Sequence, residues 1–563
     1  MTKERMDTQR LILFFIFSFS LLLLWDAWQK EQRPAASLPA PAAKTESGVP
    51  SPAKPIGPAT PPAVPVQTGV PSVPAATTGA AGGERIQVQT DLLVAEIDTL
   101  GGSLRRVELL KHKDAEDTSK NLVLLQPERH YEAQSGLTGE HGPNHRTLWV
   151  AIPGERQLQA GQAALQVRLT AEGGGGIRVE KTYTFRRDSY LVEVAMEVHN
   201  GGQAPVTTNA YFQLTHDGKE PTRGNAIAGS LGTQSFVGFA YFTSEQKYGK
   251  VQFADLDKGK AEYPKQAQDG WIAFVQHYFV AAWIPAANLG REFVIERRQD
   301  GSYAGRAVVP VGSLGPGATG NIAVPLYVGP QEQKRLEAAS ASLPLVVDYG
   351  WLTVIAQPLF WLLEMLHGLA GNWGVAIILL TVLIKLLFFP LSAASYKSMA
   401  KMKLITPRLT KIREMYAHDR TKMNQAMMEL YKTEKINPLG GCFPILVQIP
   451  VFIALYWVLL AAIELRHAPF VLWIRDLSAL DPYYVLPVLM TITMVLQTRM
   501  NPTPPDPVQA KVMQFMPYVF SVFFFFFPAG LVLYWLVNNI LSILQQWQIQ
   551  RMFDRDRPAH AKR

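Results

Sequence analysis

A lysine inside a long apolar run is the residue of this sequence most able to do chemistry. Lys385 lies in the run IILLTVLIKLLFFPL, about twelve residues or roughly 18 Å of helix from Trp373 and five residues before Pro390. A charge in the hydrocarbon of a bilayer costs at least about 2.5 kcal/mol, so by default it marks a hydrated, functional cavity. The competing interpretation is that this long side chain reaches the membrane interface from near its helix end.

Polar residues in neighbouring apolar runs would accompany this lysine. Thr381 lies one helical turn away on the same face, and Gln448 comes early in the next apolar segment. The last apolar segment contributes Asn538, Asn539 and Ser542. We therefore expect several helices to converge on one polar cavity, while polar residues that only join adjacent helices would give the same pattern.

The rest of the chain carries no pattern typical of catalysis. It has no nucleophile elbow, no H-E-x-x-H and no Walker loop. His112, His130, His141 and His145 are spread through predicted loops without the spacing of metal ligands, and we predict that they are surface residues. The single cysteine, Cys442, excludes an intramolecular disulfide framework and a cysteine-clustered metal site. We predict a protein that is not an enzyme and that needs no cofactor or metal.

Composition places much of the chain in a membrane. Of 563 residues, 48% are hydrophobic and only 18% are charged, which is too apolar for an ordinary soluble protein. The net charge of +8 could indicate nucleic acid, but no basic stripe alternates with aromatic residues. Membrane proteins collect Lys and Arg in cytoplasmic loops, so we interpret the charge as topology and expect the phospholipid bilayer, not nucleic acid, as a partner.

The chain begins with a basic segment and a first apolar segment. Residues 1–10 are predicted to be cytoplasmic, and residues 11–28 to form a signal-anchor helix; a cleaved signal peptide is the alternative. Residues 29–83 are rich in proline and alanine and have almost no large apolar residues, which predicts a disordered tether.

Residues 84–345 have the pattern of a β-domain. Alternating runs such as 177–185 and 190–198 are separated by the turn residues 186–189, which predicts an antiparallel hairpin. Glycine-rich turn clusters recur and amphipathic helices are scarce. These features favour a large β-sandwich.

Apolar segments return after this region. Residues 350–368 suit an amphipathic helix lying in the membrane interface. With the signal anchor, six transmembrane helices are predicted, the other five at 372–391, 443–465, 483–499, 512–527 and 531–548.

Loop charge predicts the orientation of these helices. Residues 392–442 hold ten basic and four acidic groups, and the tail at 549–563 is basic as well. Both are therefore predicted to be cytoplasmic, together with the loop at 500–511, whereas the β-domain and the loop at 466–482 face the periplasm. Within 395–435 two helices are expected, with a turn at 417–419 and a methionine-rich face that either meets clients or fills the seam of this hairpin.

Three strings in the helical part closely resemble the YidC/Oxa/Alb family of membrane protein insertases. They are NPLGGCFPILVQIPVFIALYWVL (437–459), DLSALDPYYVLPVLM (476–490) and FPAGLVLYWLVNNILSILQQ (527–546). The layout matches the Gram-negative type, in which a large periplasmic domain accompanies a five-helix insertase core. These motifs are long and specific, whereas the β-domain matches by size and position. The resemblance implies a supersandwich-like fold for that domain.

What the resemblance implies is a membrane protein insertase and chaperone of the inner membrane. It would move nascent transmembrane segments from the cytoplasm through a hydrated, positively charged groove, alone or with the Sec translocon and its accessory subunits. Ribosome or targeting factors would meet its cytoplasmic loops and tail, and it would consume no nucleotide. Apolar residues would form a hydrophobic slide for the arriving helix: Phe443, Ile445, Phe452, Phe523 and Phe527.

Two positions depart from the family pattern. The groove charge of the family is typically arginine, and Lys385 keeps the charge without the planar, five-donor fork. Tyr534 and Trp535 stand where two tyrosines are often found, on the helix expected to contact substrate. An alternative function is a membrane-anchored periplasmic binding or folding factor that acts through the β-domain. A small-solute transporter would predict paired inverted repeats, which we do not find.

Overall fold

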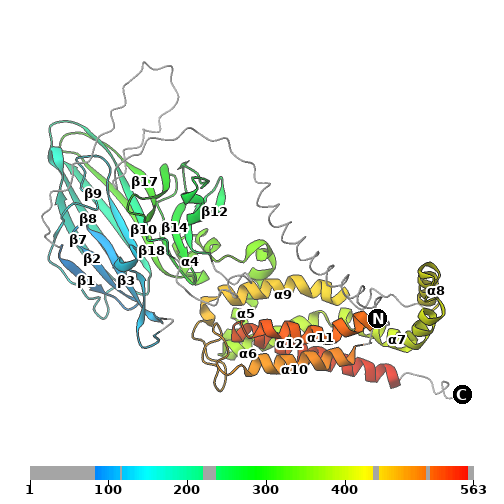
Figure 1. Ribbon diagram of the computed structural model, residues 1–563. Coiled ribbons are helices and arrows are strands. Elements are labelled where there is room, and N and C mark those ends of the chain that lie inside the picture. Colours follow the sequence, from blue (N-terminus) through cyan, green and yellow to red (C-terminus); the bar gives the residue numbers. More distant parts are fainter. Residues whose placement is uncertain (1–82, 115–116, 220–235, 435–442, 502–506, 556–563) are drawn as a thin grey trace, which may run out of the picture. The chain divides into compact units, whose positions relative to one another are not determined.

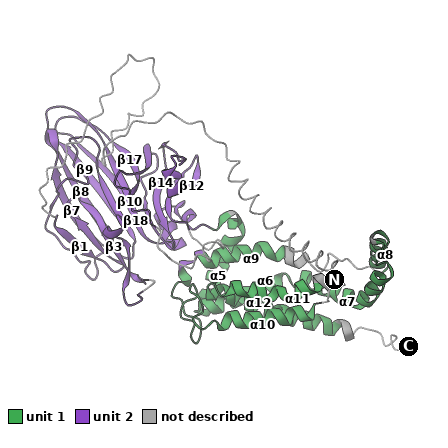
Figure 2. Cartoon of the chain, viewed as in Figure 1, with its two compact units in different colours: residues 1–43, 349–460, 464–563 green, residues 44–348, 461–463 purple. Residues whose placement is uncertain are grey.

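The chain forms two compact units. The computed structural model describes residues 83–114, 117–219, 236–434, 443–501 and 507–555. One unit contains residues 44–348 and 461–463, and the other contains residues 1–43, 349–460 and 464–563 (Figure 2). The predicted signal anchor at 11–28 and the predicted tether up to residue 82 lie outside the described residues, as do 435–442 and the end of the tail.

The β-rich unit, labelled unit 2 in Figure 2, is built on two antiparallel sheets, each with nine strands in the described part of the chain (Figure 1). The first sheet has the order β1, β2, β3, β5, β10, β17, β16, β13, and β4 also pairs with β3. Its strands are β1 (Arg85–Gln89), β2 (Leu93–Asp98), β3 (Ser103–Lys113), β4 (Asn121–Leu125), β5 (Glu132–Leu137), β10 (Val206–His216), β13 (Gln266–Ala267), β16 (Arg291–Arg297) and β17 (Tyr303–Leu314).

The second sheet has the order β12, β11, β14, β15, β18, β9, β8, β7, β6. Its strands are β6 (Val150–Ala151), β7 (Ala164–Glu172), β8 (Ile177–Arg186), β9 (Leu191–Asn200), β11 (Gly238–Thr243), β12 (Lys247–Val251), β14 (Trp271–Gln276), β15 (Phe279–Trp283) and β18 (Thr319–Pro330). Short helices flank the strands: η1 (Pro127–Arg129), η2 (Gly174–Gly176), α3 (Phe253–Asp257), α4 (Gln333–Ala339) and η3 (Leu343–Val346).

Alternation of apolar and polar side chains explains these strands. Along β8 and β9 every second residue is buried, and the two strands pair antiparallel as the predicted hairpin, which confirms the antiparallel β-rich character. Side chains of the two sheets meet in a common core, where the rings of Phe212 and Trp283 lie 5.1 Å apart. Lys181 is buried in this core, and its Nζ donates to the carbonyls of Gly102 and Ser135 at 3.0 and 2.9 Å.

Two of the histidines predicted to be surface residues are not. His112 lies on β3 with its ring 5.5 Å from that of Phe279, and its side chain is only 15% exposed. His145 is half-buried, and its Nδ1 lies 2.5 Å from the hydroxyl of Tyr211. The prediction failed because tertiary packing, rather than local sequence, covers these two positions. His130 and His141 are exposed.

The other unit, labelled unit 1 in Figure 2, is helical in its described part (Figure 1). A short 3-10 turn, η4 (Gly350–Leu352), leads into its first helix, and η5 (Ile463–Leu465) follows α9. The helices are α5 (Thr353–Ala370), α6 (Trp373–Leu387), α7 (Phe389–Met415), α8 (Arg420–Thr433), α9 (Phe443–Ala461), α10 (Val485–Met500), α11 (Pro507–Phe524) and α12 (Ala529–Arg555).

These helices differ at several ends from the predicted spans. The segment 372–391 is not one helix, because α6 ends at Leu387 and α7 continues at an angle of 66°. The helix that leads into the predicted hairpin therefore begins at Phe389 rather than at residue 392. At the other end of the unit, α11 stops at Phe524 rather than at residue 527, and α12 runs on to Arg555.

Helix length and composition single out few membrane spans in the described part of the chain. There, only α5 is both long and apolar enough to cross a membrane, with the bent pair α6 and α7 as a second span if it is counted as one. Three further apolar helices are shorter, at Val447–Ala461, Val485–Met500 and Ala510–Phe524. The count of six spans and the interfacial position of α5 remain predictions.

The hairpin of α7 and α8 has a small core of its own. Ile405 and Leu409 are buried, and Met402, Met427, Leu430 and Tyr431 pack against them. Met415 and Met428 are 70% and 52% exposed. The methionines thus divide between the seam and the surface, and contact of the exposed ones with clients stays a prediction.

Candidate functional site

Five helices of the helical unit enclose one polar cavity of about 320 Å³. Its wall is formed by residues on, or directly next to, the helices α6, α7, α9, α10 and α12. The lining residues are Lys385, Phe388, Leu391, Ser392, Ser395, Tyr396, Met399, Gln448, Ile449, Phe452, Gln497, Asn501, Tyr534, Trp535, Asn538 and Ser542. The cavity has two sides: one is lined mainly by hydroxyl and amide groups, and the other is lined by aromatic rings.

Among the described residues that line the cavity, Lys385 is the only charged one. Its side chain is nearly buried, at 9% exposure, and its Nζ donates to Ser542 Oγ at 2.8 Å. Ser542 in turn donates to the backbone carbonyl of Asn538 at 2.7 Å. The ammonium therefore has a neutral partner, and none of the lining residues is acidic, so its positive charge stays available to an anionic guest.

A break between two helices places Lys385 at the cavity. Asn372 caps α6 by accepting a hydrogen bond from the Val375 amide at 3.1 Å, which fixes where the helix begins. Pro390 has no N–H for the carbonyl of Leu386, and its ring disfavours a continuous helix, so the chain bends at Phe388. Lys385 is consequently in the last turn of α6, beside the first turns of α7.

Helical spacing aligns the other walls. On α12, Tyr534, Asn538 and Ser542 recur every four residues and so share one face. On α9, the Nε2 of Gln448 donates to the hydroxyl of Tyr534 at 3.2 Å. This bond ties α9 to α12 at the polar side of the cavity.

An aromatic cluster continues from the cavity toward α11. The ring of Phe452 lies 4.0 Å from that of Trp535, and Trp535 meets Phe524 edge-on at 4.6 Å. Tyr534 stacks on Phe452 at 6.1 Å. The cavity thus has one polar and one aromatic side.

Other residues predicted for the site lie elsewhere. Thr381 is buried and donates to the carbonyl of Ile377 within its own helix, and the Nδ2 of Asn539 points at Met490 Sδ, 3.2 Å away on α10. Phe523 is 37% exposed, and Phe527 contacts Tyr456, so neither lines the cavity. The side chains of Phe443 and Ile445, on α9, are outside the described part.

The structure adds residues that sequence reasoning missed. Ser392, Ser395, Tyr396 and Met399 follow one face of α7, and Gln497 and Asn501 come from the end of α10. The sequence does indicate these α7 residues, because positions 392, 395, 396 and 399 have the spacing of one helical face and come just after Pro390. This spacing was overlooked because residues from 392 onward were attributed to a separate cytoplasmic hairpin.

This arrangement can bind a polar or acidic segment, and it needs no covalent step to do so. A buried ammonium beside hydroxyl and amide groups can attract a carboxylate and solvate a polar chain. In the described residues no group of His, Cys, Asp and Glu side chains is arranged to hold a metal ion.

Comparison with known proteins accounts for nearly the whole chain. Residues 85–362 match the family model of the YidC periplasmic domain, and residues 365–556 match that of the 60Kd inner membrane protein. The membrane protein insertase YidC of Nitrosospira multiformis is 53% identical over 98% of each chain, and that of Methylobacillus flagellatus is 54% identical over 98% of each chain. A crystal structure of an active YidC insertase covers 82% of this chain and 94% of its own at 17% identity, with a TM-score of 0.36.

Proposed function

The chain belongs to the YidC family of membrane protein insertases, and on this premise we propose that the cavity around Lys385 is the groove through which it inserts its clients. As a member it is an inner-membrane insertase with a periplasmic domain, and it is not an enzyme. The observation that carries the groove assignment is the single ammonium of Lys385, held by Ser542 in a cavity whose lining has no acidic residue.

The groove lowers the barrier to a polar segment in two ways. A charged residue at the centre of a bilayer costs roughly 2.5–3.5 kcal/mol on insertion scales, and hydroxyl and amide groups replace part of the lost water. An acidic side chain about 4 Å from the ammonium gains up to ~4 kcal/mol at an effective dielectric constant of about 20. Because this attraction weakens with distance, the tail is not retained once it has crossed.

The aromatic side of the groove takes the apolar part of the client. Phe452 lies both in the wall of the cavity and against Trp535, so a helix leaving the polar side meets apolar surface at once. Exposed apolar residues of α11, among them Tyr518, Val519 and Val522, continue this surface. We assign the slide to Phe452 and Phe523, with Phe443 and Ile445 as its expected start. Phe527 packs against Tyr456 and Phe524, and we assign it a supporting position.

The remaining topology follows from charge and family. We infer six membrane spans, both termini in the cytoplasm, an interfacial α5 and a periplasmic β-sandwich. The basic hairpin of α7 and α8 would meet emerging clients, ribosome or targeting factors, and the Sec translocon would act as a partner for some clients. Loop charge and the layout of relatives support these inferences.

Reconstitution tests the proposal. Purified protein in liposomes is supplied with a short single-span client, and insertion is read as protection of its translocated tail from added protease. We expect insertion without other factors, and strong inhibition when Ser395→Trp fills the cavity. Its control, Ala394→Trp, changes the neighbouring exposed position of α7, which does not line the cavity. Equal insertion by both variants would show that the cavity is not the path.

A further inference from the structure

A second cavity lies wholly within the β-domain. It measures about 500 Å³ and is lined by Glu193, Phe242, Asp269, Gly270, Trp271, Ile284, Pro285, Ala286, Ala287, Ala323, Pro325, Ala339, Ser340 and Ser342. This volume is within the range of small-molecule and peptide sites, and most of the lining is apolar with a few polar groups. Nothing in the insertion mechanism uses it.

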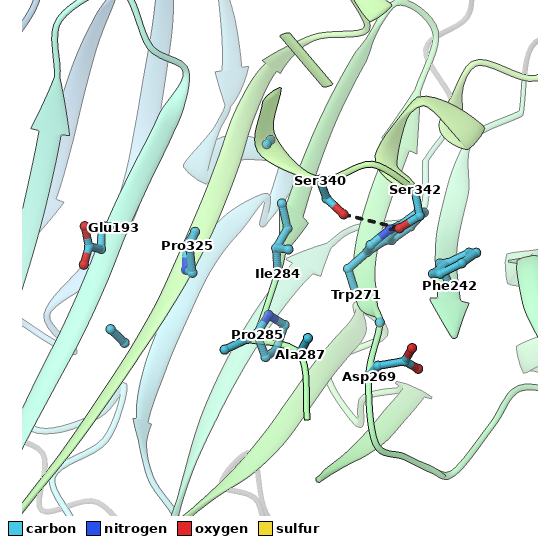
Figure 3. Close-up of a pocket in the computed structure, with 14 residues that line it drawn as sticks. Glu193, Phe242, Asp269, Trp271, Ile284, Pro285, Ala287, Pro325, Ser340 and Ser342 are labelled. Atoms are coloured by element: carbon cyan, nitrogen blue, oxygen red, sulfur yellow. Dashed lines mark hydrogen bonds between the residues drawn. The ribbon is translucent and has the colours of Figure 1, made fainter. Parts of the chain in front are cut away.

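The cavity is a trough that crosses five strands of the second sheet. Glu193 on β9 pairs with Pro325 on β18, and the carbonyl of Pro325 accepts from the amide of Ile284. Trp271 on β14 pairs with Phe242 on β11. Figure 3 shows these five side chains in a row. With strands about 4.8 Å apart, the row is roughly 19 Å long, the length of about six extended residues.

A buried arginine holds one wall of the trough. Arg291 is 1% exposed, and its guanidinium donates to the carbonyls of Gly270, Pro285 and Ala286, all of which line the cavity. Its other bonds go to the carbonyls of Gln268 and Leu289, so all five N–H groups are used. The wall is therefore preformed, and Arg291 has no donor left for a ligand.

The polar groups of the trough are mainly acceptors. Glu193 lies at one end and Asp269 lies beside Trp271 toward the other (Figure 3), and no Lys, Arg or His is among the described lining residues. Hydrogen bonds from Ser244 lower the pKa of Asp269, which keeps it ionised. Glu193 pairs with Arg186 at 3.3 Å, but the two side chains are 40% and 59% exposed, so this pair is weak and exchangeable. Pro325 also has no N–H to return to the carbonyl of Ile284, which leaves that acceptor without a ladder donor.

We propose that this trough binds an extended polypeptide segment of about six residues that carries apolar side chains and basic ends. Apolar side chains would lie over Ile284, Pro285 and Trp271, and basic ends would reach Glu193 and Asp269. Backbone N–H groups of the segment would donate to the acceptors of the lining. The trough would thus give the β-domain a binding activity separate from the groove, whose lysine attracts acidic rather than basic segments.

Binding is measured on the full-length protein in lipid nanodiscs, which avoids detergent chains in the trough. The probe is a fluorescent, amidated peptide, Lys-Val-Leu-Val-Leu-Lys, and its counterpart has both lysines replaced by glutamate. Fluorescence anisotropy gives the dissociation constants. We expect saturable binding of the basic peptide and at least about tenfold weaker binding of the acidic one.

Two pairs of variants locate the site. Ala323→Trp fills the trough, and Asn321→Trp changes the preceding outward position of β18, which is outside the lining. Glu193→Gln removes one charge, and Glu197→Gln removes the equivalent charge four residues along β9. We expect Ala323→Trp to abolish binding, Glu193→Gln to weaken it roughly threefold to tenfold, and both controls to bind like the parent.

Several results would overturn the proposal. They are absence of saturable binding, equal affinity for the acidic peptide, or equal affinity in Ala323→Trp and Asn321→Trp. Displacement of the peptide by millimolar maltose or by decanoate would assign the trough to a sugar or an acyl chain instead. Insertion by the groove is unaffected by any of these results, so the two functions are tested independently.

Discussion

At the scale of single residues, the decisive feature is a cation whose partner is neutral. Lys385 Nζ and Ser542 Oγ are 2.8 Å apart in a cavity lined by hydroxyl, amide and aromatic groups. Burial of an ammonium without a carboxylate is costly, and this cost is typical of a functional site rather than a structural one. The lysine carries its charge at one point, so it attracts an acidic tail without demanding one geometry.

The hydroxyl of Ser542 positions this charge. Ser542→Ala removes the acceptor, so the long side chain is freer to turn toward the interface. A hydrogen bond of about 1 kcal/mol corresponds to a roughly fivefold loss of insertion for clients with acidic tails. Ser542→Thr keeps the hydroxyl and should insert them like the parent, and neutral tails should respond to neither change. Equal losses in the alanine and threonine variants would mean that packing, not the hydroxyl, matters.

A histidine makes the β-domain sensitive to acid. Burial, with Arg298 and Arg146 nearby, lowers the pKa of His145 to about 3. In the unfolded chain the pKa is about 6.5, so the unfolded state binds more protons between these values. The stability that neutral His145 contributes is therefore complete above about pH 6.5 and is lost as the pH falls toward 3.

Hydrogen exchange of β5 and β10 peptides in the full chain at pH 7 and pH 5 measures this loss. We expect protection to fall by up to ~2 kcal/mol at pH 5, and His145→Gln to reduce the dependence on pH. The exposed His141 supplies the control, His141→Gln. A pH dependence unchanged in His145→Gln would exclude His145 as its source.

At the scale of elements, the bend at Phe388 organises the helical unit. It gives α7 two parts: the first turns, with Ser392 and Met399, line the cavity, and the later turns pack with α8 around Ile405 and Leu409. One helix thus connects the cavity to the hairpin of α7 and α8. A rearrangement of the hairpin would be transmitted to the cavity through α7.

Deletion of the hairpin tests this connection. Removing residues 402–431 and joining the ends with a short Gly/Ser linker keeps every cavity residue of α7, including Met399. We expect insertion to be lost while the thermal unfolding of the remaining bundle changes little, because the hairpin core is separate. Full activity of a stable deletion variant would reduce the hairpin to a connector.

Sequence periodicity predicted much of this architecture, for identifiable reasons. The alternation of apolar and polar residues at 177–185 and 190–198 predicted strands β8 and β9. The apolar run around Lys385 predicted helix α6. The sequence analysis missed the face formed by Ser392, Ser395 and Tyr396. These residues follow the apolar run of α6, and only the bend between α6 and α7 brings them to the cavity. Thr381 was predicted to line the cavity, but its hydroxyl donates a hydrogen bond to a carbonyl of its own helix. The sequence alone does not show which acceptor this hydroxyl uses.

At the scale of the whole molecule, two units carry two separate binding sites. The proposed groove is lined by residues between Lys385 and Ser542, whereas the trough is lined by residues between Glu193 and Ser342. No residue belongs to both cavities. Insertion should therefore depend on the helical unit alone.

A clean removal of the β-domain tests this independence. The strands run from Arg85 to Pro330, so deletion of residues 85–330 leaves no unpaired strand, whereas a cut at residue 310 would leave the edges of β18 exposed. We expect a single-span client with a neutral tail to be inserted at roughly the parental level in liposomes. Complete loss in a stable, membrane-integrated variant would favour a function centred on the β-domain.

The groove charge is tested most directly by the yield of inserted client as a function of tail charge. Lys385→Arg, Lys385→Ala and Lys385→Glu are reconstituted in liposomes and supplied with clients whose acidic or neutral tails have equal length. Our account predicts that Lys385→Arg is tolerated, that Lys385→Ala lowers the yield for acidic tails, and that Lys385→Glu lowers it most, with neutral tails much less affected. If the ammonium only reached the interface, its replacement by alanine would leave every client unchanged. Equal yields for acidic and neutral tails across all three variants would contradict the groove.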